Sequence, residues 1–181
     1  SFPVYFGKKK VMSRLYDIDV IGYDQGVNKL HLFDIETIDE SIVEDGIDFD
    51  KNDVDKNLTL FLYPDDSDEA GQMLRIYQQY FMVSNGARLI LKEVNEAGYD
   101  LHKLNEHVVI QINDTHPALC VPELMRILVD DHEYGWDEAW KITCETLTYT
   151  NHTVMSEALE RWNENLFREQ LPRVYQIVCE I

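Results

Sequence analysis

The sequence predicts an α/β domain with a largely parallel sheet and flanking helices, and three observations lead to this prediction. Short runs of β-branched and aromatic residues occur within the first 33 residues, as is typical of strands. Beyond residue 69, apolar residues recur at the spacing of amphipathic helices. Two short apolar runs in this later part each lead through a polar loop into a helical pattern, which is the order of elements in parallel α/β domains.

Strands are predicted at the start of the chain, before a strongly acidic tract. The strand candidates are residues 4–6, 20–23 and 27–33, and the turn-forming residues Asp24-Gln25-Gly26 separate the last two. From Asp34 to Glu69, 14 acidic residues stand against two lysines, a net charge of −12. We therefore divide the chain into a strand-rich segment (1–33), an acidic segment (34–69) and an α/β segment (70–181).

Helices dominate the structure that is predicted after the acidic tract. Apolar residues from Met73 to Phe81 fall on one face of a long helix. The run from Val108 to Ile112 is almost continuously apolar, as in a buried parallel strand. The remaining elements are predicted as a helix at 119–128, a helix at 136–145, a strand at 147–150 and helical structure over 156–181 with interruptions near Asn163 and Pro172.

The net charge restricts the classes of partner. The 181 residues carry 34 Asp and Glu against 16 Lys and Arg, a formal charge of −18. Nucleic acids and anionic membrane surfaces both attract proteins with clustered Lys and Arg, so we expect neither as a partner. No apolar run reaches the roughly 18 residues that a membrane-spanning helix needs.

The cysteines and the start of the chain favour a cytoplasmic location. Cys120, Cys144 and Cys179 are an odd number, and their apolar or helix-patterned neighbours are typical of free thiols in a reducing compartment. No secretory signal pattern opens the chain. Because the chain starts at Ser1 without an initiator Met, we expect a fragment or a processed product.

Two polar loops are the candidate ligand-binding features. The loops 113–117 (Asn-Asp-Thr-His-Pro) and 151–153 (Asn-His-Thr) each follow a short apolar run and precede a helical pattern. Ligands of open α/β sheets bind at the carboxyl ends of strands, where such loops converge. However, Asn, Asp and Thr also cap helices, and a histidine can simply pack against its neighbours. The residues alone leave both interpretations open.

Other chemistries are not favoured. His102 and His107 are five residues apart, the wrong spacing for one helix face, and the chain has no Cys-x-x-Cys or His-Glu-x-x-His pattern. The acidic run from Asp48 fails as a calcium loop because Asp53 and Thr59 stand where a glycine and a bidentate glutamate are needed. Since a glycine-rich phosphate loop and a Gly-x-Ser-x-Gly elbow are both missing, we expect no metal site and no serine hydrolase.

The two polar loops belong to longer runs that carry a family resemblance. The runs resemble signatures of the glycogen (α-glucan) phosphorylases: IQINDTHPAL at 110–119, PELMRIL at 122–128, YTNHTV at 149–154 and EALERW at 157–162. YPDD at 63–66, with the residues from Gly71 to Phe81, resembles the gate loop of this family and its following helix. Since the similarity runs in family order over nearly the whole chain, the sequence is identified as a member of the family.

The resemblance implies a glycosyltransferase that cleaves terminal α-1,4 bonds of a glucan with inorganic phosphate and releases glucose 1-phosphate. It also implies two Rossmann-like domains that face each other across a cleft, with pyridoxal phosphate on a lysine of the second domain. The chain then resembles an internal fragment of the first domain, which lacks the cofactor lysine and is inactive alone. The resemblance leaves the preference among glycogen, starch and maltodextrin open.

Two further properties follow from the resemblance. The family forms homodimers through its tower region, but the acidic tract is shorter than that region, so the resemblance leaves a dimer open here. Some members are allosteric enzymes that are activated by AMP and carry paired arginines where this chain has Lys92 and Glu93. Because the carboxylate of Glu93 repels a phosphate group, we do not expect AMP activation.

Site residues are carried over from the resemblance one by one. His152 resembles the histidine that faces the sugar at the cleavage point, and Asp114 and His116 resemble loop residues beside the glucan subsite. We expect these three to be the catalytic residues. The expected substrate-binding residues lie on the same two loops: Asn113, Asn151 and Thr153. The residues that resemble the gate loop, which controls access to the cleft, are Asp65, Asp66 and Ser67.

Two other functions stay open from the sequence. The chain can act as a carbohydrate-binding module through the loops at Asp114 and His152, because convergent polar groups recognise sugar hydroxyls without catalysis. It can also be a scaffold piece that self-associates through an exposed half-interface. Saturable binding of a maltooligosaccharide and a monomeric state in solution separate these alternatives.

Overall fold

The computed structural model describes residues 1–36, 58–60, 62, 64–156 and 159–181. Residues 37–57, which make up most of the acidic segment and the expected tower region, lie outside the described residues. The chain divides into two compact units, 1–78 and 79–181, and each is described by itself. Within the described ranges, no helix has the length and apolar character needed to cross a membrane.

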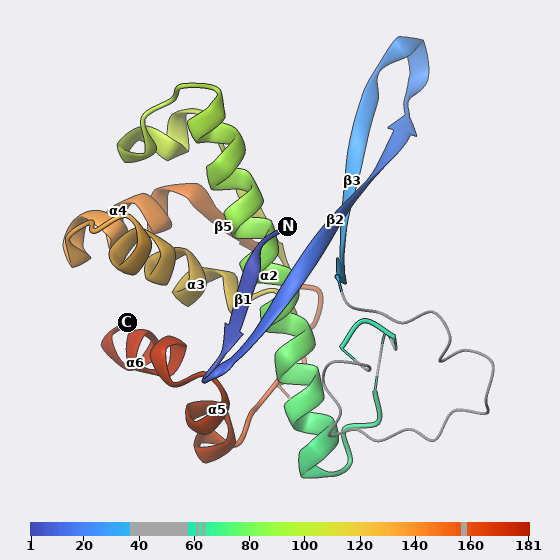
Figure 1. Ribbon diagram of the computed structural model, residues 1–181, viewed down its shortest axis with the longest axis vertical. Coiled ribbons are helices and arrows are strands. Elements are labelled where there is room, and N and C mark those ends of the chain that lie inside the picture. Colours follow the sequence, from blue (N-terminus) through green and yellow to red (C-terminus); the bar gives the residue numbers. More distant parts are fainter. Residues whose placement is uncertain (37–57, 61, 63, 157–158) are drawn as a thin grey trace. The chain divides into compact units, whose positions relative to one another are not determined.

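The first unit contains an antiparallel three-stranded sheet in the order β1-β2-β3. β1 (Pro3–Phe6) pairs with the start of β2 (Lys9–Ile21), and the rest of β2 pairs with β3 (Val27–Ile35). Figure 1 shows β2 and β3 as a long, narrow hairpin. The strands predicted at 4–6 and 27–33 are therefore confirmed. The strand predicted at 20–23 is confirmed only at residues 20 and 21, because β2 begins at Lys9 and ends at Ile21, and Tyr23 lies in the turn.

The far end of this hairpin is a tight turn that exposes apolar side chains. A 3-10 turn at Tyr23–Gln25 connects the strands, and Asp24 takes a left-handed φ of 58°. Asp tolerates this conformation better than most residues, which explains the turn predicted here. The side chains of Ile21 and Tyr23 at this end are 81% and 101% exposed.

The base of the sheet packs against the long helix α2 (Glu69–Glu96). Phe6 is buried, and its ring centroid lies 4.4 Å from that of Tyr77 on α2. The helix begins with a side-chain cap, because Oδ1 of Asp68 accepts a hydrogen bond of 2.7 Å from the backbone N–H of Gly71. The helix predicted over Met73–Phe81 is therefore confirmed, and it continues into the second unit.

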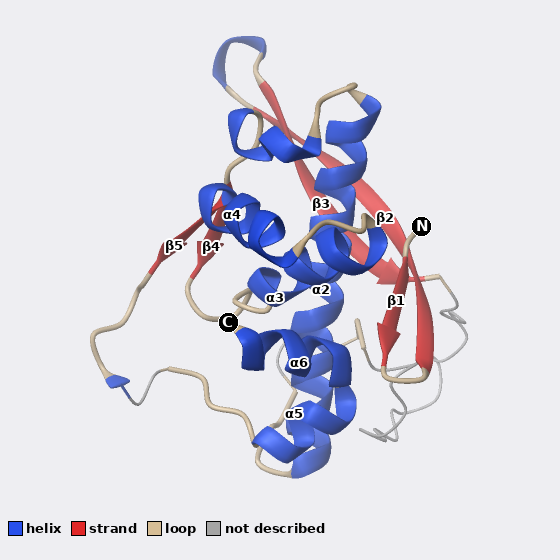
Figure 2. Cartoon of the chain, turned by 90° about the vertical axis from the view of Figure 1, so that its left-hand side faces the viewer, coloured by secondary structure: helices blue, strands red, loops and turns tan. Residues whose placement is uncertain are grey.

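The second unit packs helices around one short strand pair. Its elements after α2 are η3 (Leu101–Glu106), β4 (Ile110–Asn113), α3 (Cys120–Arg126), η4 (Ile127–Asp131), α4 (Trp136–Thr146), β5 (Leu147–Thr150), α5 (Glu164–Gln170) and α6 (Pro172–Glu180). Figure 2 shows β4 and β5 next to each other. Apolar side chains from α2, η3, α3, α4 and α6 form the core, among them Leu91, Leu104, Leu124, Ile142 and Ile177.

The pairing of strands differs from the prediction of a largely parallel sheet. β4 and β5 do pair in parallel, but the larger sheet, β1-β2-β3, is antiparallel. The tight turn at Tyr23–Gln25 explains this outcome, because two strands joined by so short a connection can pair only as a hairpin. The described residues therefore form a mixed α/β fold in which antiparallel pairing predominates.

One predicted helix begins later than the sequence indicates. Helical structure was expected from Ser156, but α5 begins at Glu164, and the described residues 159–163 form no helix. Leu159 is 42% exposed and Arg161 is exposed, so this stretch has little buried apolar surface to stabilise a helix. The interruptions predicted near Asn163 and Pro172 are confirmed, since Asn163 caps α5 and Pro172 begins α6.

Candidate active site at the ends of β4 and β5

The two polar loops begin side by side because β4 and β5 run in parallel. In the strand register, Asn113 at the end of β4 lies opposite Thr150 at the end of β5. The backbone N–H of Asp114 donates a hydrogen bond of 2.8 Å to the carbonyl oxygen of Thr150. The loops 113–117 and 151–153 therefore leave the same edge of the strand pair, where the sequence predicts a ligand site.

The side chains of Gln111 and of two threonines reinforce this strand pair. Nε2 of Gln111 donates to Oγ1 of Thr150 over 2.5 Å, and Oγ1 of Thr148 donates to Oε1 of Gln111 over 2.6 Å. All three side chains are exposed. Their hydrogen bonds therefore add to those of the backbone on one face of the strand pair and do not contribute to the core. Cross-strand contacts of this kind fix the register and hence the relative height of the two loops.

The first loop is held in a left-handed turn at Asp114. This residue has a φ of 65°, and its Oδ1 accepts a hydrogen bond of 2.7 Å from the N–H of Thr115. The turn continues without a break, since the N–H of Ala118 donates to the carbonyl of Thr115 over 3.0 Å. His116 is exposed within this turn. The loop therefore presents a half-buried carboxylate and an imidazole on a well-bonded backbone.

The second loop is a turn closed by Asn151. Its Oδ1 accepts from the N–H of Thr153 over 3.0 Å, and its Nδ2 donates to the carbonyl of Thr153 over 2.6 Å. These bonds are a typical Asx turn, in which a short amide side chain replaces backbone partners. His152, at the centre of the turn, is exposed. Asn151 and Thr153 thus support the loop through their own backbone and side chains.

One contact joins the two loops directly. Nε2 of His152 is hydrogen-bonded to Oδ1 of Asn113. Because an amide oxygen only accepts, the imidazole donates through Nε2, which leaves Nδ1 as its acceptor in the neutral ring. The structure therefore brings together the predicted residues of both loops: Asn113, Asp114, His116, Asn151, His152 and Thr153.

The predicted gate-loop residues belong to the first unit. Oδ1 of Asp65 accepts from the N–H of Ser67 over 3.1 Å, and Oδ2 of Asp66 lies 3.9 Å from Nε of Arg75 on α2. A Cβ atom added at Gly71 would come within 1.8 Å of the carbonyl oxygen of Asp65, so the loop passes very close to the start of α2.

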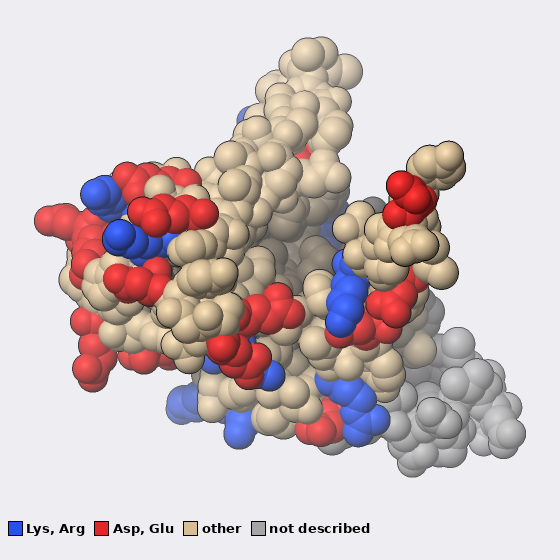
Figure 3. Space-filling view, turned by 90° about the horizontal axis from the view of Figure 1, so that it is seen from above, with Lys and Arg blue, Asp and Glu red and all other residues tan. Residues whose placement is uncertain are grey.

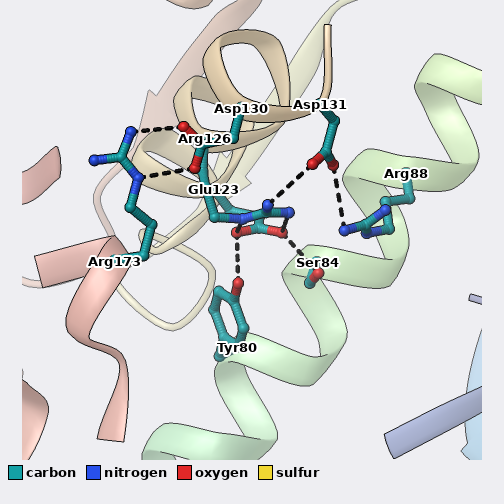
Figure 4. Close-up of polar contacts among 8 residues, drawn as sticks. All are labelled: Tyr80, Ser84, Arg88, Glu123, Arg126, Asp130, Asp131 and Arg173. Carbon is teal, nitrogen blue, oxygen red and sulfur yellow. Dashed lines mark hydrogen bonds and ion pairs between the residues drawn. The ribbon is translucent and has the colours of Figure 1, made fainter. Parts of the chain in front are cut away.

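A buried polar network next to the first loop was not predicted. Glu123 on α3 is fully buried and accepts hydrogen bonds from the hydroxyls of Tyr80 and Ser84, both 2.7 Å long (Figure 4). Arg126 donates to both oxygens of the same carboxylate over 2.9 Å. The sequence held one signal for it, since Glu123 falls on the apolar side of the predicted helix 119–128 and Arg126 follows at i+3.

The network shifts the acid–base behaviour of its members. Burial, with a further contribution from the negative charge of Glu123, raises the pKa of the Tyr80 hydroxyl far above its usual range. Burial acts to lower the pKa of Arg126, but the hydrogen bonds and charge of Glu123 raise it overall. Burial also raises the pKa of the nearby Cys120 thiol to about 12, so this cysteine is a poor nucleophile.

The site offers hydrogen-bonding groups and little positive charge. Imidazole, amide and carboxylate groups can donate to and accept from the hydroxyls of a neutral polyol. The lysines of the second unit are exposed, and two of them form helical ion pairs, Lys92 with Glu96 at 3.7 Å and Lys103 with Glu106 at 3.9 Å. In the part of the chain that the structure describes, no cluster of His, Cys, Asp and Glu could hold a metal ion.

On one face of the described residues, Figure 3 shows acidic side chains over several parts, with Lys and Arg between them. The fold and the site are therefore those of an α/β protein that binds a ligand at the ends of adjacent parallel strands. Two polar loops lie there, and they are rich in groups that recognise hydroxyls.

Comparison with known proteins agrees with this description and identifies the family. A family model described as carbohydrate phosphorylase matches residues 2–181. The chain belongs to the carbohydrate phosphorylase family. The match contains both histidine-bearing loops and the gate-loop residues in one family alignment.

Individual relatives agree with the family. Maltodextrin phosphorylase of Streptococcus pneumoniae is 50% identical over all of this chain, which covers 24% of that relative. Glycogen phosphorylase of Bacillus subtilis is 45% identical over 92% of the chain and 21% of the relative. Glycogen phosphorylase 2 of Dictyostelium discoideum is 46% identical over 70% of the chain and 13% of the relative. The chain therefore spans less than a quarter of the length of these relatives.

Proposed function

We propose that this chain forms part of the glucan-binding side of an α-glucan phosphorylase, which transfers a terminal glucosyl unit to inorganic phosphate. One observation carries the proposal: the parallel register of β4 and β5 places His152 against Asn113, so that both family-like loops face one site. The hydrogen-bonding character of these loops supports a sugar as the ligand. Glucose 1-phosphate is then the product.

His152 is the residue that we assign to the cleavage point. Glycoside cleavage develops positive charge on the anomeric carbon, and a backbone carbonyl dipole that faces this carbon stabilises the charge. The hydrogen bond from Nε2 of His152 to Asn113 fixes the orientation of the ring. Asp114 and His116 then hydrogen-bond to the sugar hydroxyls or orient them. Asn113, Asn151 and Thr153 bind substrate or hold these groups in place.

The gate loop is assigned to control of phosphate access. Asp65 and Asp66 place negative charge on a short loop that is anchored at its end by the cap of α2. Such a loop repels phosphate when it lies across an entrance and admits phosphate when it moves aside. Ser67 lies within this loop and donates its backbone N–H to Asp65.

The lysines of the second unit do not fit the attachment of pyridoxal phosphate. A covalently attached cofactor needs a sheltered lysine, whereas Lys92, Lys103 and Lys141 of the second unit are all exposed. We therefore assign the cofactor to the rest of a full-length enzyme and derive no step through it. The proposal further includes a Rossmann-like first domain that is largely parallel once complete, a homodimeric assembly and a cytoplasmic location.

The test is phosphorolysis by the full-length protein. We expect phosphate-dependent release of glucose 1-phosphate from maltoheptaose. His152→Ala keeps the backbone carbonyl but loses the side-chain bond to Asn113 that orients the loop, so kcat should fall by up to about 10²-fold, as for other misplaced catalytic groups. The 181-residue chain is expected to be inactive alone, and any glucose 1-phosphate released by it contradicts this part of the proposal. Saturable maltoheptaose binding by a full-length protein that does not phosphorolyse indicates a carbohydrate-binding function instead.

A further inference from the structure

One turn of α2 contacts the chain segments that follow both histidine-bearing loops. Nε2 of Gln79 donates to the two carboxylate oxygens of Glu160 over 2.9 and 3.0 Å. The next residue, Tyr80, donates to Glu123 over 2.7 Å, and Ser84 does the same from one turn further along. Successive helix residues point about 100° apart, which lets Gln79 and Tyr80 reach two different segments.

Glu123 is the centre of the first of these anchors (Figure 4). Its carboxylate is fully buried, and each oxygen accepts two hydrogen bonds. The chain of contacts continues from Arg126 to Asp131 at 3.4 Å and from Asp131 to Arg88 on α2 at 3.3 Å. The charges of these four residues cancel, so the network fixes α3 and η4 to α2 without leaving a net buried charge.

The first loop is firmly connected to this anchor. Backbone hydrogen bonds link consecutive stretches from Thr115 through Pro117 and Leu119 to Glu123. The opposite end of the loop is fixed by the bond from Asp114 to Thr150. Because α3 has seven residues, too few for a helix that is stable alone, its position depends on tertiary contacts. His116 therefore lies between two fixed points.

The second loop has a weaker connection to the same helix. Glu160 lies eight residues beyond His152, and of the described residues between them only Ser156 has a helical conformation, a 3-10 turn. Gln79 is 7% exposed and Glu160 is half-buried, so their hydrogen bonds are partly shielded from water, which strengthens them. This contact ties the far end of the segment to the turn of α2 that also holds Glu123.

Stability alone does not explain a buried carboxylate at position 123. Apolar side chains of similar volume often replace a buried ion pair with little loss of stability or even a gain. An apolar contact, however, allows α3 to slide or rotate on α2, whereas four hydrogen bonds to one carboxylate allow a single arrangement. What Glu123 adds is therefore a defined position.

We propose that Glu123 and Glu160 are positioning residues, which fix the two histidine-bearing loops relative to each other through the turn Gln79–Ser84 of α2. Neither carboxylate touches substrate in this assignment. The catalytic consequence rests on the proposed function, whereas the ordering of the loops does not.

The test uses the full-length protein and two measurements. In Glu123→Gln, which keeps the shape of the side chain, we expect amide hydrogen exchange at 114–118 to become at least about tenfold faster. We expect kcat to fall about 10- to 100-fold, as misplaced catalytic groups do, with KM for phosphate changed less than kcat. In Glu160→Ala, faster exchange is expected at 151–155, and the swap Gln79→Glu/Glu160→Gln should restore it because the pair is rebuilt in reverse.

Asp130→Asn is the matched control. It breaks a bidentate ion pair with Arg173, with bonds of 2.6 and 2.8 Å, at the opposite end of the same helical segment. It should change neither the exchange at 114–118 nor kcat. Unchanged exchange and unchanged kcat in Glu123→Gln, with only a lower Tm, would overturn the proposal. If the wild-type protein shows no phosphorolysis, the proposed function fails, and the exchange measurements still decide whether these residues position the loops.

Discussion

Two regions of the molecule depart in opposite ways from the usual pattern of buried apolar and exposed charged side chains. The surroundings of α3 bury charge, and the β2–β3 hairpin exposes apolar side chains. Around α3, the carboxylate of Glu123 is buried at 0% exposure and paired with the guanidinium of Arg126, whose side chain is 13% exposed. Along the hairpin, apolar side chains such as Ile21, Ile18 and Leu30 are 81%, 48% and 48% exposed. In the first region specific side-chain pairs hold the structure, and in the second the backbone ladder does.

This difference indicates in which region a single substitution will strongly lower the free energy of unfolding. A residue whose contacts are made in the core cannot be removed without leaving a cavity or an unpaired group. A residue on an exposed hairpin loses few contacts, because the ladder between the strands does not depend on its side chain. Matched substitutions in the two regions therefore test the comparison. Two matched pairs come first below, followed by a pair of glycines on α2 and a single pair of charges, and the four predictions are ordered by expected effect.

The largest effect is expected from Glu123→Ala. It leaves the guanidinium of Arg126 buried without its main partner, which costs about 3–5 kcal/mol of unfolding free energy. Its match on the hairpin is Asp17→Ala, where the carboxylate contacts His31 at 2.7 Å and Lys29 at 3.8 Å but is exposed, so less than about 1 kcal/mol is expected. Urea unfolding followed by circular dichroism measures both, and equal losses contradict the comparison.

The next effect concerns apolar residues. Leu124→Ala removes a side chain with 0% exposure from the core of the second unit and should cost about 2–5 kcal/mol. Leu30→Ala on β3 removes one that is 48% exposed, and should change stability by no more than about 0.5 kcal/mol. Thermal unfolding of the two variants side by side is sufficient. A large loss in Leu30→Ala would show that something covers the hairpin in solution.

Two glycines of α2 give a third, smaller contrast. In Gly71→Ala the new Cβ meets the carbonyl oxygen of Asp65 at 1.8 Å, so the gate loop must move at a cost of about 1–3 kcal/mol. Gly86→Ala meets nothing within 4 Å and should stabilise the helix by about 0.5–1 kcal/mol. Opposite signs in the change of Tm are the expected result. The same sign for both variants contradicts the close approach at Gly71.

The smallest effect depends on pH. Hydrogen bonds from Arg173 lower the pKa of Asp130, so the pair contributes stability above the unfolded-state pKa near 3.9. This contribution is lost as the pH falls through the lower folded-state pKa. Since the pair is partly exposed, Asp130→Asn should cost about 1 kcal/mol or less at pH 7. The unfolding free energies of the variant and the wild type should converge as the pH falls through the lowered folded-state pKa of Asp130, and a difference that grows on acidification contradicts the assignment.

Much of the fold could be predicted from local patterns. The strand at 147–150 and the turn after Tyr23 were predicted because β-branched residues and Asp–Gln–Gly chemistry act over a few residues. The helix expected from Ser156 was wrong, because local propensity does not show whether a face will be buried. A largely parallel sheet was likewise expected, and the short connection at the hairpin tip decided against it.

The site was predicted in part, for a similar reason. Both polar loops were found from their residue types, but the hydrogen bond between His152 and Asn113 depends on a strand register that no local pattern contains. The network at Glu123 was missed because its donors Tyr80 and Ser84 lie about 40 residues earlier in the chain. The apolar neighbours of Glu123 in the predicted helix indicate that it is buried, but they do not identify these two donors.

Gln79 and Tyr80 are neighbours on α2, but they bond to two different and distant glutamates. Each side chain must therefore keep its direction around the helix axis, which restricts insertions and deletions in this part of α2. Inserting one residue between Gln79 and Tyr80 turns the rest of the helix by about 100°, so the donors to Glu123 turn away when Gln79 keeps its bond to Glu160. A change of three or four residues restores the direction but moves the donors by about one helical pitch, 5.4 Å, along the axis. Relatives that keep both anchors must therefore keep this turn of α2 free of insertions and deletions.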